Sequence, residues 1–561
     1  DVDTGTTEVD TGTTEVDTGT TAVDTGTTEI DTGTTDLEVE TLSIGDESQE
    51  IRTTLSQSTG SADTSSDIPN DDAQGGNDVE VALLADPSDE TQILVVEGDD
   101  PPDETLESVE LDPGSFSGDS SVFLSAWVDP GSRVSRGNNV DVDDFRRDLG
   151  DRIEEVTPGE FIGYVEHLRA AEYGNYWGVS YQVPVVESSL NAIQNVLRVT
   201  NENTDTVSAV LYTFAYEDRL ELALVLPTGA PLRHTVENVS LAELRRTTAQ
   251  LRRRLTSRVF GSLPTYLPSA QRLYRWIIAP FRQALEEEEV DVLQFSLDPG
   301  LRSLPMAMLH DGEQFLIENF AVATIPSFAL LDTNYQPLQN STVLAAGTAE
   351  FETLPRLPAV PVEVEAIDKA WETVALLDQE FTLAGIQAAR RDANVAIAHL
   401  ATHAFFQPGD PDQSYVQLWG TERIDLDAIA AFNFHSPPLG LLVLSACRTA
   451  VGDDSAELGF AGLSIQSGAR SVVASLWQVS DSGTLALMAE FYDALADLPT
   501  KAEALRQAQL GMLRGKVTIE QGQLRGISRG TLPLPEAIGG NPLDFTHPYF
   551  WSGFTLVGAP W

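Results

Sequence analysis

Cys447 is the only cysteine in this chain of 561 residues. It follows the apolar run LGLLVL at 439–444 and precedes the short sequence RTAVG at 448–452. This pattern predicts a buried strand that delivers a thiol into a loop. A second apolar run, VAIAHLAT at 395–402, delivers His403 in the same way. Histidine and cysteine at the carboxyl ends of neighbouring parallel strands are the minimum machinery of a cysteine hydrolase.

A thiol attacks only as the thiolate, so Cys447 needs a base or a positive neighbour. His403 can serve because an imidazole accepts a proton near neutral pH. An oxyanion would need hydrogen-bond donors, and the backbone N–H groups of Ala404 and Cys447 are the natural candidates. The alternative for a single cysteine after an apolar strand is a small buried hydrophobic residue. The paired histidine strand favours the catalytic interpretation.

His399 and His403 have the H-x-x-x-H spacing of some zinc sites. In the zinc motif a glutamate follows the first histidine and both histidines lie on a helix. Here Leu400 follows His399, the stretch has the pattern of a strand, and no third ligand is evident. We therefore expect no metal and no cofactor, and we expect His399 to pack behind the site.

Strand and helix patterns alternate from residue 291 onward, which predicts an α/β fold with a mostly parallel sheet. The active crevice of such a sheet lies at the carboxyl ends of its strands. Strands are expected at 292–297, 321–325, 342–346, 374–377, 396–401, 440–445 and 471–476, and helices at 362–373, 383–390, 460–467 and 482–495. Upstream, helices are expected at 141–155, 160–173, 188–199, 241–257 and 267–288, and strands at 122–128, 206–216, 220–226 and 232–236.

The amino-terminal part has a different composition. Residues 1–35 are five seven-residue units ending in DTGTT, and residues 36–120 are rich in Asp, Ser, Gly and Pro. A period of seven suggests a coiled coil, but only one position per unit is apolar. We therefore expect a long, disordered, acidic amino-terminal segment, with 1–35 as repeats and 36–120 as a low-complexity linker. Residues 121–204 are expected to form a small, mostly helical region.

Negative charge concentrates in this segment. Residues 1–130 hold 34 Asp and Glu and one basic residue, Arg52, giving −33 of the total charge of −54. Nucleic acids and anionic membranes attract clusters of Lys and Arg, so we exclude both as partners. No apolar run approaches the roughly 20 residues of a membrane span, and a single cysteine fits the reducing cytoplasm. The chain begins inside a repeat rather than at Met, so we expect a fragment that could have lost an export signal.

Several stretches occur in the order in which they occur in one known family. They are DPGLRSLP at 298–305, LHDG at 309–312 with FLI at 315–317, PS at 326–327, HLATH at 399–403, LSACRTAVG at 444–452, ELGFAGL at 457–463, SLWQVSD at 475–481 and HPYFWSGF at 547–554. Together they resemble the CHAT domain, a clan of caspase-like proteins related to separase, and above all its cyanobacterial members. The resemblance covers about residues 205–561, with a pseudo-caspase-like half at about 205–335 and a catalytic half at about 336–561.

The resemblance implies a caspase-like α/β/α sandwich and a peptidase dyad, with His403 as general base and Cys447 as nucleophile. One position departs from the family pattern, because the family usually has Gly after the dyad histidine and this chain has Ala404. Glycine allows an N–H to approach an oxyanion closely, also at an unusual φ, so the added methyl could narrow the site.

Asp481 is the main candidate for substrate specificity. The stretch WQVSD at 477–481 resembles the separase segment whose Asp receives a basic P1 side chain, which implies charge-assisted selection of Arg or Lys. The alternative is that Asp481 or Ser480 is the N-cap of the following helix. Asp453 and Glu457, in the loop after Cys447, are further P1-pocket candidates or part of a solvated acidic loop.

The leading hypothesis is a bacterial cysteine endopeptidase that hydrolyses protein or peptide substrates, with a preference for a basic P1 residue. We expect it to stay latent until an activating or regulatory protein engages it. Because no 34-residue helical repeat is evident, regulation would come from the amino-terminal region or from parts missing upstream. One alternative is a catalytically silent, caspase-like interaction or signalling module, for which Ala404 is the sequence support. The other is a cargo domain of a surface or adhesion protein, with the DTGTT repeats as its stalk.

Overall fold

The computed structural model describes residues 141–561 except 178–185, 258–263, 393–394, 406–413, 426–433, 435, 447–461, 463 and 466. Of residues 1–140 it describes only short strands, namely β1 Ile30–Asp31, β2 Asp36–Leu37, β3 Val39–Ile44, β4 Glu50–Leu55, β5 Glu80–Leu84 and β6 Gln92–Val96. The strand expected at 122–128 lies outside the described residues, and the disorder of the amino-terminal segment stays a prediction. The chain divides into two compact units, Asp1–Ser120 and Ser121–Trp561.

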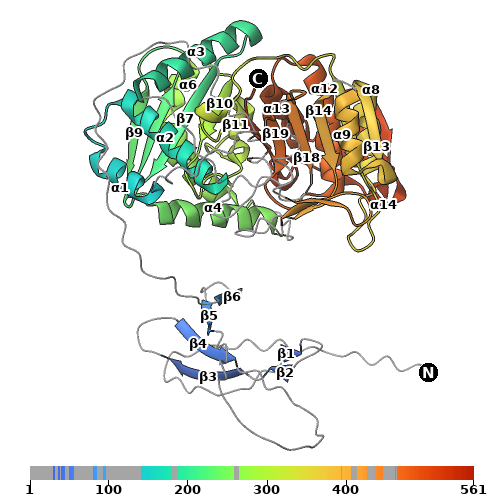
Figure 1. Ribbon diagram of the computed structural model, residues 1–561, viewed down its shortest axis with the longest axis horizontal. Helices are drawn as coiled ribbons and strands as arrows, with labels where there is room; N and C mark the ends of the chain where they lie inside the picture. Colours follow the sequence, from blue (N-terminus) through green and yellow to red (C-terminus); the bar gives the residue numbers. More distant parts are fainter. Residues whose placement is uncertain are drawn as a thin grey trace, which may run out of the picture. The chain divides into compact units, whose positions relative to one another are not determined.

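An 11-stranded sheet organises the second unit, in the order β13-β12-β14-β18-β19-β24-β11-β10-β7-β8-β9 (Figure 1). Its strands are β7 Ser208–Ala215, β8 Arg219–Val225, β9 Leu232–Glu237, β10 Val292–Ser296, β11 Ala321–Thr324, β12 Thr342–Gly347, β13 Glu372–Leu377, β14 Val395–Ala401, β18 Leu441–Ser445, β19 Ser471–Ser475 and β24 Phe554–Gly558. β12, β13, β14, β18 and β19 are parallel, and so are β24, β11, β10 and β7. β24 runs antiparallel to β19, so the carboxyl ends of the two sets point to opposite edges of the sheet.

The described helices are α1 Val142–Arg152, α2 Pro158–Trp177, α3 Val186–Thr204, α4 Leu241–Thr256, α5 Leu267–Ile277, α6 Arg282–Glu287, α7 Leu316–Asn319, α8 Val360–Ala370, α9 Leu383–Asp392, α12 Asp481–Asp497, α13 Lys501–Leu513, α14 Glu536–Gly539 and α15 Pro548–Trp551. Helices lie close to the ranges predicted at 141–155, 160–173, 188–199, 241–257, 362–373, 383–390 and 482–495, whereas α7, α13, α14 and α15 were not predicted. Much of the helix expected at 460–467 lies outside the described residues. Short 3₁₀ turns lie at Ala279–Phe281, Met306–Met308, Phe328–Leu330 and Asp378–Glu380.

The expectation of one long helix at 267–288 is wrong. The segment forms α5, a 3₁₀ turn and α6, and the break falls at Pro280. Proline has no N–H to donate and its ring clashes with the preceding helical turn, so a continuous helix would be strained there.

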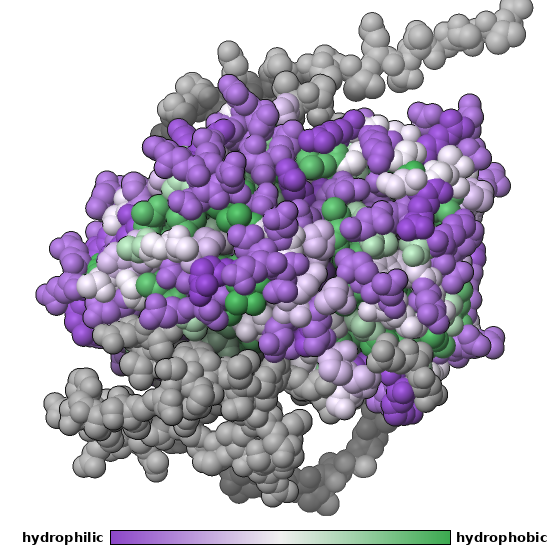
Figure 2. Space-filling view, turned by 90° about the horizontal axis from the view of Figure 1, so that it is seen from above, coloured by the Kyte–Doolittle hydropathy of each residue, from purple (hydrophilic) through white to green (hydrophobic). Residues whose placement is uncertain are grey.

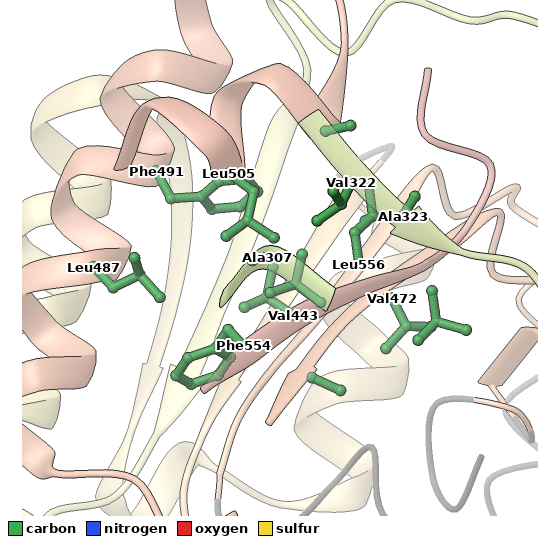
Figure 3. Packing of buried hydrophobic residues seen from close by; sticks show 14 of the residues in the cluster. Ala307, Val322, Ala323, Val443, Val472, Leu487, Phe491, Leu505, Phe554 and Leu556 are labelled. Atoms are coloured by element: carbon green, nitrogen blue, oxygen red, sulfur yellow. The ribbon is translucent and has the colours of Figure 1, made fainter. Parts of the chain in front are cut away.

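Alternation along β14 shows that helices cover both faces of the sheet. Ala398 and Leu400 line a small apolar cavity with Ile386 of α9. His399, on the opposite face, contacts Tyr492 of α12. Figure 3 shows the core from close by, with side chains of α12, α13 and the central strands packed together. The predicted α/β class, with a mostly parallel sheet between layers of helices, is confirmed.

Helices α1–α3 contribute to the same unit. Buried side chains such as Phe161, Leu168 and Leu197 pack against Tyr212 and Phe214 of β7. A second connection is ionic, because the fully buried carboxylate of Asp298 pairs with two helix arginines, at 2.8 Å from Arg146 and 2.7 Å from Arg169. These ion pairs connect α1 and α2, in the helical region expected at 121–204, to Asp298 at the start of the stretch DPGLRSLP.

Two smaller sheets complete the unit. One is formed by β15 Ala404–Phe405, β16 Tyr415–Gln417 and β17 Arg423–Asp425, and the other by β20 Thr518–Glu520, β21 Gln523–Ile527, β22 Gly530–Pro533 and β23 Leu543–Asp544. Figure 2 shows a face that is mostly hydrophilic, with hydrophobic residues in small separate groups. Among the described residues, no helix is both long and apolar enough to cross a membrane.

Candidate functional site

The two strands that lead to the predicted dyad are neighbours in the sheet. β14 and β18 pair in parallel, and their last register pair joins Ala401 to Ser445. His403 follows Ala401 by two residues, and Cys447 follows Ser445 by two residues. Cys447 itself lies outside the described residues, as do Asp453 and Glu457. The structure therefore shows the chain up to Ala446 but not the thiol of Cys447.

The imidazole of His403 is held on two sides. Its Nε2 lies 2.8 Å from the backbone oxygen of Pro355, and its ring lies 4.6 Å from the ring of Phe351, centroid to centroid. A carbonyl oxygen only accepts hydrogen bonds, so Nε2 must carry the proton. The neutral ring then keeps Nδ1 as the nitrogen that can accept a proton. The ring is partly exposed, so a substrate can reach it.

Ala404 begins β15, opposite Val416 of β16. The N–H of Gln417 donates to the oxygen of His403 at 2.9 Å, so these two residues form a hydrogen-bonded pair. Such pairs alternate along an antiparallel ladder, and the N–H of Ala404 therefore points away from β16. The described residues with a left-handed φ do not include Ala404, so alanine fits this backbone without the freedom of glycine.

Asp481 is the first residue of α12, and its side chain does not cap that helix. The N-cap is Ser480, whose hydroxyl accepts from the N–H of Gly483. The carboxylate of Asp481 instead accepts from the N–H of Ala359, at 3.0 Å, at the start of α8. Burial raises the pKa of this carboxyl to about 7, with a smaller contribution from nearby Glu363 and against the lowering effect of the hydrogen bond from Ala359. A buried carboxyl with a perturbed pKa beside a cleft is a candidate for function.

A hollow of about 770 Å³ is lined in part by residues 477–480, which directly precede Asp481 in the chain. Its walls are the carboxyl-terminal half of α4, residues 477–480 and the α15 region, with Arg252, Arg253, Trp477, Tyr549 and Phe550 among the lining side chains. Hydrogen bonds fix its shape, because Arg252 donates to the oxygen of Leu476 at 3.0 Å and the hydroxyl of Tyr549 donates to that of Gln478 at 2.7 Å.

The approach to Cys447 is fixed by buried hydroxyl groups. The hydroxyl of Ser445 donates to Glu363 of α8 at 2.7 Å, and that of Ser475, at the end of β19, donates to the oxygen of Ala446 at 2.6 Å. Our sequence analysis did not identify Glu363, Ser445 or Ser475. The only sequence signal was the position of Glu363 on the apolar face of its helix. No group of His, Cys, Asp and Glu suited to a metal ion occurs among the described residues.

Comparisons with known proteins agree with the resemblance. The family model of the CHAT domain matches residues 267–559, which is more than half of the chain, and the chain belongs to this family. Comparison with curated protein sequences finds no match.

Two solved structures of cysteine proteinase type are among those similar to this one. Gingipain R of Porphyromonas gingivalis, described as an Arg-specific cysteine proteinase, has 10% identity and a TM-score of 0.35, with 57% of this chain and 74% of that chain covered. Separase, in the Saccharomyces cerevisiae separase–securin complex, has 10% identity and a TM-score of 0.39. That match covers 71% of this chain but only 34% of separase.

Proposed function

We propose that this chain is a cysteine endopeptidase that cleaves protein or peptide substrates after a basic residue. The observation that carries the proposal is the register of β14 and β18, which brings the chain to His403 and to Cys447 two residues beyond the same pair. Adjacent strands lie about 4.8 Å apart, so Ala401 and Ser445 end their strands side by side. That the two residues which follow this pair meet is part of the proposal.

In the proposed reaction, Nδ1 of His403 takes the proton of the Cys447 thiol as sulfur attacks the substrate carbonyl. The N–H groups of Ala404 and Cys447 bind the resulting oxyanion. His403 then gives its proton to the leaving amine, and the acyl group stays on sulfur as a thioester. Water, deprotonated by His403, hydrolyses the thioester and releases the thiol. The oxygen of Pro355 keeps the ring oriented throughout and stabilises the imidazolium.

Asp481 is the proposed receptor of the basic P1 side chain. Two observations support this role: Asp481 directly follows residues 477–480, which line the hollow, and burial raises the pKa of its carboxyl to about 7. A guanidinium or ammonium group would supply the counter-charge that this carboxylate lacks among its described neighbours. Asp453 and Glu457 are proposed as further walls of this pocket. A regulatory protein that controls access to the hollow is proposed to change this activity, which the purified chain already has.

Labelling with peptidyl ketone probes tests this function. The purified chain is treated with probes bearing Arg, Leu or Asp at P1, alongside the variants His403→Ala and Asp481→Ala. We expect Cys447 to react with the Arg probe at least tenfold faster than with the others, and to lose most of this rate in either variant. Equal labelling of wild type and His403→Ala would show an exposed thiol without a dyad.

A further inference from the structure

Glu363 is a buried acidic residue that faces the sheet. It lies on α8 with Val360, Val364 and Ile367, at the i, i+3, i+4 and i+7 spacing of one helix face, and only 2% of its surface is exposed. A buried carboxylate costs free energy unless it is paired and hydrogen-bonded. The contacts of the Glu363 carboxylate therefore have to offset the free-energy cost of its burial.

One oxygen of Glu363 contacts both strands that lead to the proposed dyad. Oε1 accepts from the hydroxyl of Ser445, the last residue of β18, at 2.7 Å. The same oxygen lies 2.9 Å from Nε2 of His399 on β14, although no described group meets hydrogen-bond geometry at that nitrogen. The other ring nitrogen of His399 lies 3.2 Å from the hydroxyl of Tyr492. The side chains of His399 and Tyr492 are fully buried, so water does not screen these contacts.

The segment that precedes Glu363 contacts the other proposed groups. The oxygen of Pro355 accepts from His403, and the N–H of Ala359 donates to Asp481. Residues 355–363 thus contact the base, the end of the nucleophile strand and the proposed P1 carboxylate.

We propose that Glu363 is a positioning residue of this peptidase, which sets the distance between Cys447 and His403 through its hydrogen bond from Ser445 on one strand and its close contact with His399 on the other. The inference rests on the proposed function. Glu363 does not touch the reacting atoms, and its effect is on alignment. A displacement of about 1 Å in a catalytic pair can cost about 100-fold in rate.

The single cysteine makes a direct test simple, because iodoacetamide can alkylate no other thiol in the chain. The reagent needs no peptide pocket, so its rate reports the dyad alone. The rate is measured between pH 5 and 9 for wild type, His403→Ala and Glu363→Gln. The matched control is Glu365→Gln, on the same helix, where the carboxylate is exposed and pairs with Lys369 at 2.7 Å.

We expect Glu363→Gln to alkylate at least tenfold more slowly than wild type at pH 6.5, with a pH profile moved upward toward that of His403→Ala. Glu365→Gln should stay within about twofold of wild type. A folded Glu363→Gln variant with the wild-type rate and profile would overturn the positioning role alone. A wild-type thiol that reacts no faster than in His403→Ala would overturn the dyad, and with it both proposals.

A second variant decides the result if Glu363→Gln does not fold. Ser445→Ala removes one hydroxyl and leaves the carboxylate in place. We expect a roughly three- to tenfold loss of rate, since one hydrogen bond is worth about 1 kcal/mol. In the double variant, the two losses should not add, because both act through the same contact. A wild-type rate in Ser445→Ala would overturn the proposal.

Discussion

Replacement of Asp481 by asparagine should make the protein more stable above neutral pH. Burial raises the pKa of this carboxyl from 3.8 to about 7. Between these values the unfolded state has lost the proton while the folded state keeps it, so the free energy of unfolding falls as pH rises. Below about pH 4 both states are protonated and the penalty disappears. Asparagine never ionises, and its side-chain oxygen can still accept from Ala359.

The size of the effect follows from the shift. Three pKa units correspond to about 4 kcal/mol, which is an upper limit because the side chain is partly exposed. We expect the stability advantage of Asp481→Asn over wild type to grow by about 2 kcal/mol between pH 5 and pH 8. Urea unfolding, followed by tryptophan fluorescence at both pH values, measures this difference directly.

The control is Asp497→Asn, at the exposed end of the same helix, which should show no change with pH. The reasoning would be refuted if Asp481→Asn were less stable than wild type at pH 8. That result would mean that the carboxylate stabilises the start of α8 by more than its burial costs. The same variant should also lose the preference for the Arg probe, which links the buried charge to substrate selection.

Three further predictions concern other parts of the unit. Asp298→Asn should cost about 3–5 kcal/mol, since it leaves Arg146 and Arg169 with Glu172 as their remaining carboxylate partner. Despite the burial of Asp298, these arginines hold its pKa at about 2, so wild type should lose about 2 kcal/mol of this stability, measured by acid unfolding, as pH falls from about 4 to 2. Ser475→Ala should slow alkylation of Cys447 about three- to tenfold, because the preceding carbonyl loses its hydrogen bond; a wild-type rate would contradict the role of this contact. Ala404→Gly should leave the rate within about twofold, as the alanine is not in a left-handed conformation, and a large gain would show that the methyl obstructs the site.

The alternating strands and helices could be predicted from sequence because buried parallel strands are continuous apolar runs. The runs before His403 and Ser445 have this form, and the structure places them side by side. The antiparallel pairing of β24 with β19 could not be predicted, because the sequence of an apolar strand does not indicate whether it runs parallel or antiparallel to its neighbour. The helix α13 was not predicted at all.

The position of His403 just after β14 was predictable, because an apolar run of strand pattern precedes it; its role in a site stays a prediction. The oxygen of Pro355 that orients it could not be predicted, because a backbone acceptor leaves no signal in side-chain chemistry. For Asp481 the sequence allowed two interpretations, a helix cap or a P1 carboxylate. The hydrogen bond that its carboxylate accepts comes from Ala359 at the start of another helix, and such a contact depends on tertiary packing. Glu363 was detectable only as a charge on an apolar helix face.

Hydrolysis of a peptide with one internal arginine tests the central claim most directly. The products are identified by mass spectrometry for wild type, Cys447→Ala and His403→Ala. The account predicts cleavage after the arginine by wild type and at least a hundredfold less by either variant. Undiminished cleavage by Cys447→Ala, or no cleavage by a wild-type protein whose Cys447 reacts with the Arg probe, would contradict it.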